Sequence, residues 1–219
     1  MILFIFPSRE RPVKCFAAID NIISMIGEGI DYKIQLTLDL DDATMSNQEV
    51  RDRINSYGEN VKAYWGTSTG KVFAINRDME FSGEWDILCL HSDDFLFIKL
   101  DFGKDILKAF EGFSGLVHFP DGFQNERLIT YPMMSREYFN LFGYIYHKDY
   151  YSVYGDDEQM AVAKKLGRYK YVPTSIFLHQ HYLAGYGAPD ELSKKEDSPE
   201  MYEKDKATFL RRKELNFDL

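Results

Sequence analysis

Cysteine, long apolar runs and clustered positive charge are all scarce in this sequence of 219 residues. The two cysteines, Cys15 and Cys89, form neither a CxxC motif nor a disulfide framework, which favours a reducing compartment. No stretch approaches the ~20 apolar residues of a membrane-spanning helix. The apolar residues 1–6 are too few for the core of a signal peptide. We therefore expect a cytoplasmic protein without a transmembrane segment.

The charge balance argues against nucleic acid as a partner. The formal net charge is -9, and no long run of Lys or Arg is present. A protein that binds duplexes needs a face of Lys and Arg to neutralise phosphates. A nucleoside diphosphate is still compatible with an acidic chain, because a bound divalent cation supplies positive charge locally.

Aromatic residues are abundant, at 16%, with 15 Tyr and 17 Phe. Such rings either fill a core or line a pocket for ring-shaped polar ligands, since Tyr offers a flat apolar face and a hydroxyl. Core packing is the expected use of any one of them. The alternative is a wall on which ring-shaped ligands stack, for which the members are Trp65, Trp85, Tyr131, Tyr146, Tyr150 and Tyr151.

Short apolar strands alternate with helices over the first 100 residues. We expect strands at residues 2–6, 33–40, 61–65 and 86–90. Helices are expected at residues 17–26, where isoleucines recur at helical spacing, and from Gly70 through Asp78. This alternation implies βαβ units and a mostly parallel sheet flanked by helices, an α/β fold. Ligands collect beyond the carboxyl ends of such strands, so the loops there are the places to search.

The elements become shorter after Gly112. Strands are expected at residues 115–119, 127–130, 169–172 and 176–178. A helix is expected at residues 135–142, with Ser135 as its N-cap and Gly143 as its stop, and another at residues 156–166. Residues 189–219 are charged and weakly apolar, which predicts surface helices or a tail.

Two adjacent carboxylates, Asp93 and Asp94, follow one of the expected strands. Such a pair repels itself unless something neutralises it. Mg²⁺ and Mn²⁺ do so, since they prefer oxygen ligands and share them with substrate phosphates. The alternative is a solvated acidic turn, because paired acids are common in loops.

His179 and His181 also follow a strand. Residues two apart in an extended chain point the same way, so both imidazoles could face one site. The alternative is a pair of ordinary, partly buried histidines. A barrel hydrolase with an HxH metal site would carry it on the first strand of a chain of about 250 residues, so we discount that class.

Asp156 and Asp157 open a helix, where acids either stabilise the helix dipole or serve as a general base. Residues 66–71 look like a P-loop, but the motif fails because Val72 stands where Ser or Thr is required.

In their order along the chain, these motifs resemble the GT-A nucleotide-sugar glycosyltransferases, especially the family 2-like members. The turn after the first strand is similar to their nucleotide-binding turn, and Asp39 to the acid that reads the base. Lys71 and Asn76 lie at characteristic positions of the helix before the metal strand. The residues that the resemblance assigns to nucleotide binding are Pro7, Ser8, Arg9, Asp39, Lys71, Asn76 and Asp93.

The resemblance also assigns metal ligands and a base. Ser92-Asp93-Asp94 is similar to the DxD motif, with Asp94 as the dependable ligand and Ser92 in place of the first acid. His179 or His181 fits the C-terminal histidine that completes the metal site. Asp157 fits the base of the xED motif, although Asp156 stands where Glu is usual.

A GT-A domain over residues 1–188 is thereby implied, with a Rossmann-like nucleotide half at about residues 1–100 and an acceptor half at about 101–188. The implied enzyme is a glycosyltransferase of the hexosyltransferase type. It would move a sugar from a nucleotide diphosphate, a UDP-sugar by its frequency in the family, to a saccharide or other hydroxyl acceptor. The xED-like site favours inversion, and a histidine ligand favours Mn²⁺ over Mg²⁺.

Two other functions remain open from the residues. A sugar nucleotidyltransferase shares the sheet and the metal chemistry, but it would carry a Gly-rich loop after the first strand, which residues 8–12 lack. A catalytically silent module that keeps the nucleotide pocket is the other alternative, and a turnover assay separates it from an enzyme.

Overall fold

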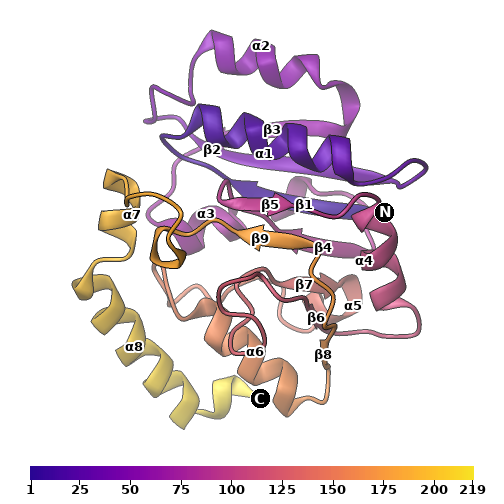
Figure 1. The fold of residues 1–219 in the computed structure, drawn as a ribbon. Coiled ribbons are helices and arrows are strands. Elements are labelled where there is room, and N and C mark those ends of the chain that lie inside the picture. Colours follow the sequence, from indigo (N-terminus) through magenta and orange to yellow (C-terminus); the bar gives the residue numbers. More distant parts are fainter.

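A seven-stranded sheet with the order β3-β2-β1-β4-β7-β6-β8 forms the centre of the protein, in a computed structural model that describes residues 1–219 (Figure 1). Its strands are β1 (Ile2–Pro7), β2 (Tyr32–Asp39), β3 (Val61–Gly66), β4 (Ile87–Leu90), β6 (Leu116–His118), β7 (Met133–Ser135) and β8 (Tyr169–Tyr171). All neighbours pair in parallel except β7, which is antiparallel to both β4 and β6. The prediction of a mostly parallel sheet is confirmed.

A second, two-stranded sheet pairs β5 (Phe95–Phe97) with β9 (Phe177–His179) in antiparallel fashion. The prediction of a strand at residues 127–130 is wrong, and β7 was not predicted from the sequence. Residues 127–130 lie in a loop because the carboxylate of Asp121 turns the chain by accepting backbone N–H groups of residues 123–125 and then the hydroxyl of Thr130. The fully buried Met133 and Met134 supply the strand instead.

Eight helices surround the sheet: α1 (Pro12–Met25), α2 (Gln48–Ser56), α3 (Lys71–Arg77), α4 (Phe102–Phe110), α5 (Arg136–Phe139), α6 (Gly155–Lys165), α7 (Glu191–Glu196) and α8 (Pro199–Glu214). The first begins earlier than expected because Pro12 occupies its first turn, where a missing N–H costs nothing. The fifth is shorter than expected, although Ser135 caps it through the N–H of Tyr138 as predicted. None of the helices is both long and apolar enough to cross a membrane.

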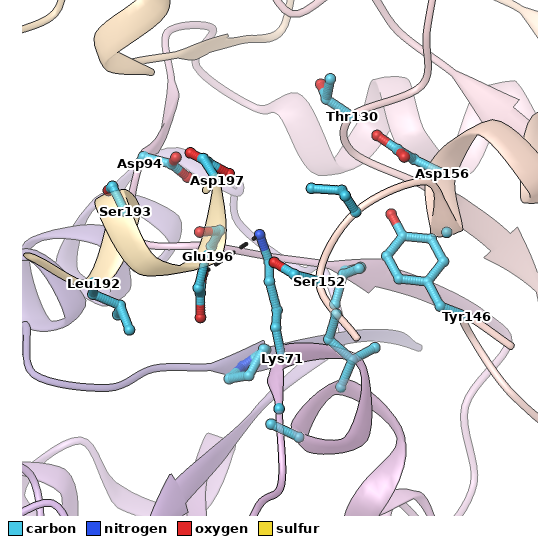
Figure 2. Close-up of a pocket in the computed structure, with 18 of the residues that line it drawn as sticks. Lys71, Asp94, Thr130, Tyr146, Ser152, Asp156, Leu192, Ser193, Glu196 and Asp197 are labelled. Atoms are coloured by element: carbon cyan, nitrogen blue, oxygen red, sulfur yellow. Dashed lines mark ion pairs between the residues drawn. The ribbon is translucent and has the colours of Figure 1, made fainter. Parts of the chain in front are cut away.

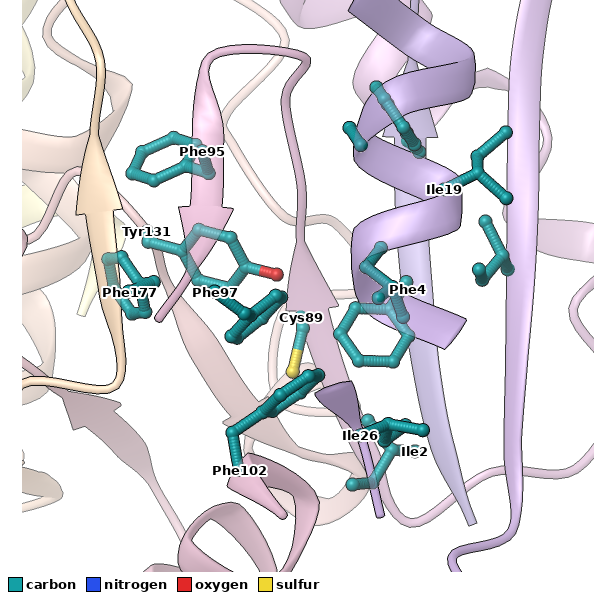
Figure 3. Close-up of a cluster of buried hydrophobic side chains, with 14 of the residues drawn as sticks. Ile2, Phe4, Ile19, Ile26, Cys89, Phe95, Phe97, Phe102, Tyr131 and Phe177 are labelled. Carbon is teal, nitrogen blue, oxygen red and sulfur yellow. The ribbon is translucent and has the colours of Figure 1, made fainter. Parts of the chain in front are cut away.

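Successive side chains of β1 point to opposite faces of the sheet, as in any strand, and they pack into a separate hydrophobic core on each face. Phe4 and its like-facing neighbours join a cluster covered by α1, α2 and α4, whose rings include Phe97 and Phe102 (Figure 3). Leu3 and Ile5 join a second cluster, covered by α3, α5 and α6. Aromatic residues therefore build both cores, and Tyr131 is buried in the first.

The charged C-terminal residues form α7 and α8, which lie along one side of the molecule, with α8 beside α6 (Figure 1). Only Asp205 and Arg212 are buried in α8, and both are charged. The guanidinium of Arg212 donates to both oxygens of Glu158 on α6 at 2.8–3.1 Å. This ion pair anchors the last helix.

We expect Arg212→Ala to lower the free energy of unfolding by about 3–5 kcal/mol, because it leaves the carboxylate of Glu158 buried without its partner. Urea unfolding followed by circular dichroism measures the change. Arg211→Ala, at a mostly exposed neighbour, is the control and should change stability by less than about 1 kcal/mol. Equal effects of the two variants would show that the buried pair is not the anchor.

Candidate functional site

One large cavity opens beyond the carboxyl ends of β1, β2 and β4, where a parallel sheet places its ligands. Its volume is about 770 Å³, and 41 residues line it. Every residue that the resemblance assigns to the nucleotide, the metal or the base lines this cavity except Asn76. The residues that it brings together are Pro7, Ser8, Arg9, Asp39, Lys71, Asp93, Asp94, Asp156, Asp157, His179 and His181.

Asn76 is the predicted nucleotide-binding residue that the structure does not bring to the cavity. Its side-chain amide donates to the carbonyl of Tyr146 at 2.8 Å, and its oxygen accepts the N–H of Ile145 at 2.8 Å. The amide is thus engaged in holding α3 against the chain before α6.

Asp39, at the end of β2, lies between two arginines. Arg9 reaches one carboxylate oxygen at 3.0 Å and Arg77 reaches the other at 2.8 Å. A further bond from Arg9 to Asp41 lowers the pKa of that carboxyl. Arg77 was not found by sequence reasoning, because an arginine at the end of a short helix carries no pattern of its own.

Asp93 lies at the floor of the cavity with 4% of its side chain exposed. Burial raises its pKa to about 6, and the charge of Asp94 adds to this, while the salt bridge from Arg11 at 3.1 Å opposes it. The hydroxyl of Ser8 donates to its other oxygen at 3.4 Å. Arg11, unassigned from the sequence, therefore ties the turn after β1 to the DxD-like segment.

Asp94 and His179 are brought together by the pairing of β5 with β9, which sets Phe95 opposite His179. The Nε2 atom of His179 lies 3.2 Å from one oxygen of Asp94. The other oxygen, Oδ1, is buried and has no hydrogen-bond partner. Two neighbouring ligands of an octahedral ion with bonds of about 2.1 Å lie roughly 3 Å apart. The spacing and the unpartnered oxygen both fit a divalent cation.

No cluster of three or more His, Cys, Asp or Glu side chains forms a complete metal cage. Cations of the Mg²⁺ type are commonly held by one or two carboxylates together with substrate phosphates. The pair Asp94 and His179 is therefore a partial site that phosphate oxygens would complete.

Asp121 supports His179 from behind. Its backbone carbonyl accepts the N–H of His179 at 2.8 Å, and its carboxylate lies 3.3 Å from the Nδ1 atom. Burial alone would lower the pKa of His179, but the two flanking carboxylates raise it to about 9. The Pro120-Asp121-Gly122 sequence indicates only a turn, so this role could not be read from it.

His181 faces other partners. Its Nε2 atom lies 3.5 Å from Asp197, and its Nδ1 atom accepts the N–H of Leu183 at 3.3 Å. The ring stacks on Phe123 with centroids 5.8 Å apart. Both nitrogens of His181 are thus engaged away from Asp94, so His179 is the histidine that lies beside that carboxylate.

Asp156 and Asp157 lie in the first turn of α6 and line the cavity. The backbone N–H of Asp157 donates to the carboxylate of Asp156 at 3.0 Å. Burial is the main cause that raises the pKa of both carboxyls, and for Asp156, where the charge of Asp157 adds to it, the value reaches about 7. A carboxylate with a raised pKa in a cavity is suited to taking a proton near neutral pH.

Lys71, the first residue of α3, points into the cavity between Asp94 and Asp156 (Figure 2). Figure 2 shows its ammonium group among Asp94, Asp156, Glu196 and Asp197. It lies 3.8 Å from Glu196. Loss of hydration would lower the pKa of Lys71, but Glu196 and Asp94 raise it, so the group is a cation. A cation here is placed to meet an anionic ligand.

No protein-family profile matches the sequence, and no curated protein does either. Solved structures do match. A mannosyltransferase, PcManGT from Pyrobaculum calidifontis, in complex with GDP-Man and Mn²⁺, superposes with a TM-score of 0.65 at 14% identity, over 81% of this chain and 56% of the other. TarS 1-349 of S. aureus with UDP-GlcNAc gives 0.60 at 11% identity, over 80% and 57%.

A 4-diphosphocytidyl-2C-methyl-D-erythritol synthase from Anaerococcus prevotii gives a lower TM-score of 0.51 at 12% identity, over 80% of this chain and 87% of the other. The chain thus spans less than two thirds of the length of the two glycosyltransferases. At these identities the likeness concerns the fold, and it confirms the fold expected from the sequence motifs. The chain has the GT-A fold of nucleotide-sugar glycosyltransferases.

Proposed function

We propose that the protein is a metal-dependent glycosyltransferase that moves a sugar from a nucleotide diphosphate to a hydroxyl acceptor. The observation that carries the proposal is the single cavity at the carboxyl ends of the strands. It holds a partial cation site, a lysine and a pair of carboxylates with raised pKa values. Two structures of the same fold hold GDP-Man with Mn²⁺ and UDP-GlcNAc, which supports this donor class.

In this proposal, the turn after β1 and Asp39 bind the nucleoside, with Asp39 held in place by Arg9 and Arg77. Lys71 faces the diphosphate. Asp94 and His179 would hold Mn²⁺ or Mg²⁺, and His179 favours Mn²⁺ because that ion accepts nitrogen ligands more readily. Such an ion neutralises the charge that develops on the diphosphate as the sugar leaves.

Asp157 is proposed as the base that takes the proton of the acceptor hydroxyl. Asp156 accepts the N–H of Asp157 and is also under the influence of the charge of Lys71, so Asp157 has the freer carboxylate. An attack from the face opposite the leaving diphosphate would give inversion at the sugar carbon. UDP-sugars are proposed as donors on the resemblance alone.

The Asp121 carboxylate keeps a proton on Nδ1 of His179, so Nε2, which lies beside Asp94, is the nitrogen that would bind a metal after giving up its own proton. We expect Asp121→Asn to weaken Mn²⁺ binding by about 10–100-fold, the usual cost of losing such a partner. Titration of Mn²⁺ followed by electron paramagnetic resonance measures it without any substrate. Asp42→Asn, at another buried acid that accepts backbone N–H groups, is the control. Unchanged Mn²⁺ affinity in Asp121→Asn would contradict this role.

A turnover assay tests the proposal. The protein is incubated with Mn²⁺ and UDP-, GDP- or TDP-sugars, with and without simple saccharide acceptors, and the released nucleoside diphosphate is quantified. Release that depends on Mn²⁺ and increases with an acceptor is expected. Formation of pyrophosphate from a nucleoside triphosphate and a sugar phosphate would support a nucleotidyltransferase instead. Binding without any turnover would support a silent module.

A further inference from the structure

One face of α8 lies against the segment that carries the proposed base. The residues of this face recur at spacings of three and four, as one side of a helix requires: Tyr202, Asp205, Phe209 and Arg212. Each contacts the chain between residues 151 and 158 through its side chain. This spacing is usual for apolar residues, yet two of the four here are charged, and these two are the only buried residues of the helix.

Asp205 is fully buried and forms the centre of this contact. Its carboxylate accepts three consecutive backbone N–H groups, from Tyr151 at 3.0 Å, Ser152 at 2.8 Å and Val153 at 2.9 Å. Consecutive N–H groups that converge in this way form a concave nest for an anion. The protein fills that nest with its own carboxylate, supplied from about 50 residues further along the chain.

The nest lies directly before α6. Tyr154 follows with a positive φ of 64°, a strained value for a non-glycine residue, and Gly155 then begins the helix. The ring of Tyr154 lies against Phe209 with centroids 5.6 Å apart and against Tyr202 at 6.4 Å. One turn into α6, Arg212 holds Glu158. The chain is therefore fixed by α8 on both sides of Asp156 and Asp157.

We propose that Asp205 is a positioning residue for the catalytic carboxylates: by holding residues 151–153, it sets where α6 begins and so where Asp156 and Asp157 lie in the cavity. The inference rests on the proposed function for its link to transfer. Asp205 itself lies outside the cavity, whereas Tyr151, Ser152 and Val153 line it. Asp205 therefore acts through the segment that it holds.

The test compares Asp205→Asn with Glu203→Gln, an exposed acid on the same helix. Asn has nearly the shape of Asp but no charge, and with its oxygen at the Oδ2 position its amide nitrogen faces the N–H of Tyr151, which it cannot accept. We expect backbone amides of residues 151–154 to exchange hydrogen at least tenfold faster in Asp205→Asn, with the central strands unchanged. We also expect kcat for transfer to fall by about 10–100-fold, since small displacements of a reacting group cost this much.

The affinity for the nucleoside diphosphate with Mn²⁺ should stay within twofold of the wild type, because neither Asp94 nor His179 is hydrogen-bonded to residues 151–153. A general loss of structure would instead weaken donor binding and accelerate exchange everywhere. Unchanged kcat, or a donor affinity that falls in parallel with kcat, would overturn the inference. Glu203→Gln should resemble the wild type in all three measurements.

Phe209→Ala is the second variant, and it tests whether α8 positions this segment if Asp205→Asn does not fold. It removes the ring against Tyr154 and leaves the buried carboxylate in place, so we expect the same pattern with a smaller, several-fold loss of kcat. A loss of donor affinity without a loss of kcat would overturn the inference here too. If the wild type transfers no sugar under any condition, the proposed function fails. Hydrogen exchange alone then decides whether Asp205 holds residues 151–154, and unchanged exchange overturns the inference.

Discussion

Replacing Asp157 by Asn is expected to lower kcat for sugar transfer by about 10²–10⁴-fold, the usual contribution of a positioned general base. The affinity for the nucleoside diphosphate with Mn²⁺ should not change, because Asp157 lies on α6, across the cavity from the turn after β1. Steady-state kinetics together with calorimetric titration of the nucleotide measures both quantities. Asp156→Asn is expected to cost less, since its carboxylate already accepts an N–H group.

The carboxyls of Asp156 and Asp157 also determine the pH dependence that we expect for transfer. The base must be ionised, and burial raises the pKa of both carboxyls, to about 7 for Asp156. The rate should therefore rise with pH through an acid limb well above the ordinary carboxyl value of ~3.9. That limb belongs to the pair and not to one residue. Full activity in Asp157→Asn, or a rate that is flat down to pH 4.5, would show that these carboxyls take no proton in the reaction.

The second large effect is expected at the cation site. We expect Asp94→Asn to lower kcat/KM by about 10³-fold, since a bound ion supplies several kcal/mol of charge stabilisation and each 1.36 kcal/mol is tenfold. In Asp94→Asn, binding of the nucleotide should also no longer depend on Mn²⁺. We expect Asp94, and not Asp93, to be the critical acid, because Oδ1 of Asp94 has no partner whereas Asp93 already pairs with Arg11.

The matched control is Asp52→Asn, at an exposed acid on α2. It removes the same charge from the protein as a whole, so it separates a local cation site from a general electrostatic effect. If Asp52→Asn and Asp94→Asn reduced activity equally, or if Asp94→Asn bound nucleotide with an unchanged Mn²⁺ dependence, the cation site would be elsewhere.

The part of the candidate site within the first 100 residues was readable from the sequence because its signals are local. A buried parallel strand appears as an unbroken apolar run, as in residues 2–6, and side chains that line the cavity follow directly in the next loop. The turn after β1, Asp39 and Asp94 were found in this way, and all line one cavity.

The remaining parts could not be predicted because they depend on contacts between distant segments. Asn76 sits at a position typical of the family, but its side chain binds the chain near residue 145. Asp121 is an ordinary turn residue until the pairing of β5 with β9 places His179 beside it. Asp205 lies in a stretch whose charged composition indicates only a surface, and its burial depends on a nest of N–H groups about 50 residues earlier.

The proposed function requires that this cavity bind a nucleoside diphosphate through a divalent cation. A thermal-shift panel of UDP, GDP, CDP, TDP and ADP, each with and without Mn²⁺, measures such binding. A ligand at 100 times its dissociation constant stabilises a fold by about 2.7 kcal/mol, which is readily measured. We predict a shift with one of the diphosphates that requires Mn²⁺ and is lost in Asp94→Asn. No shift with any of the five, or a shift that Asp94→Asn and EDTA leave intact, would contradict the proposed function.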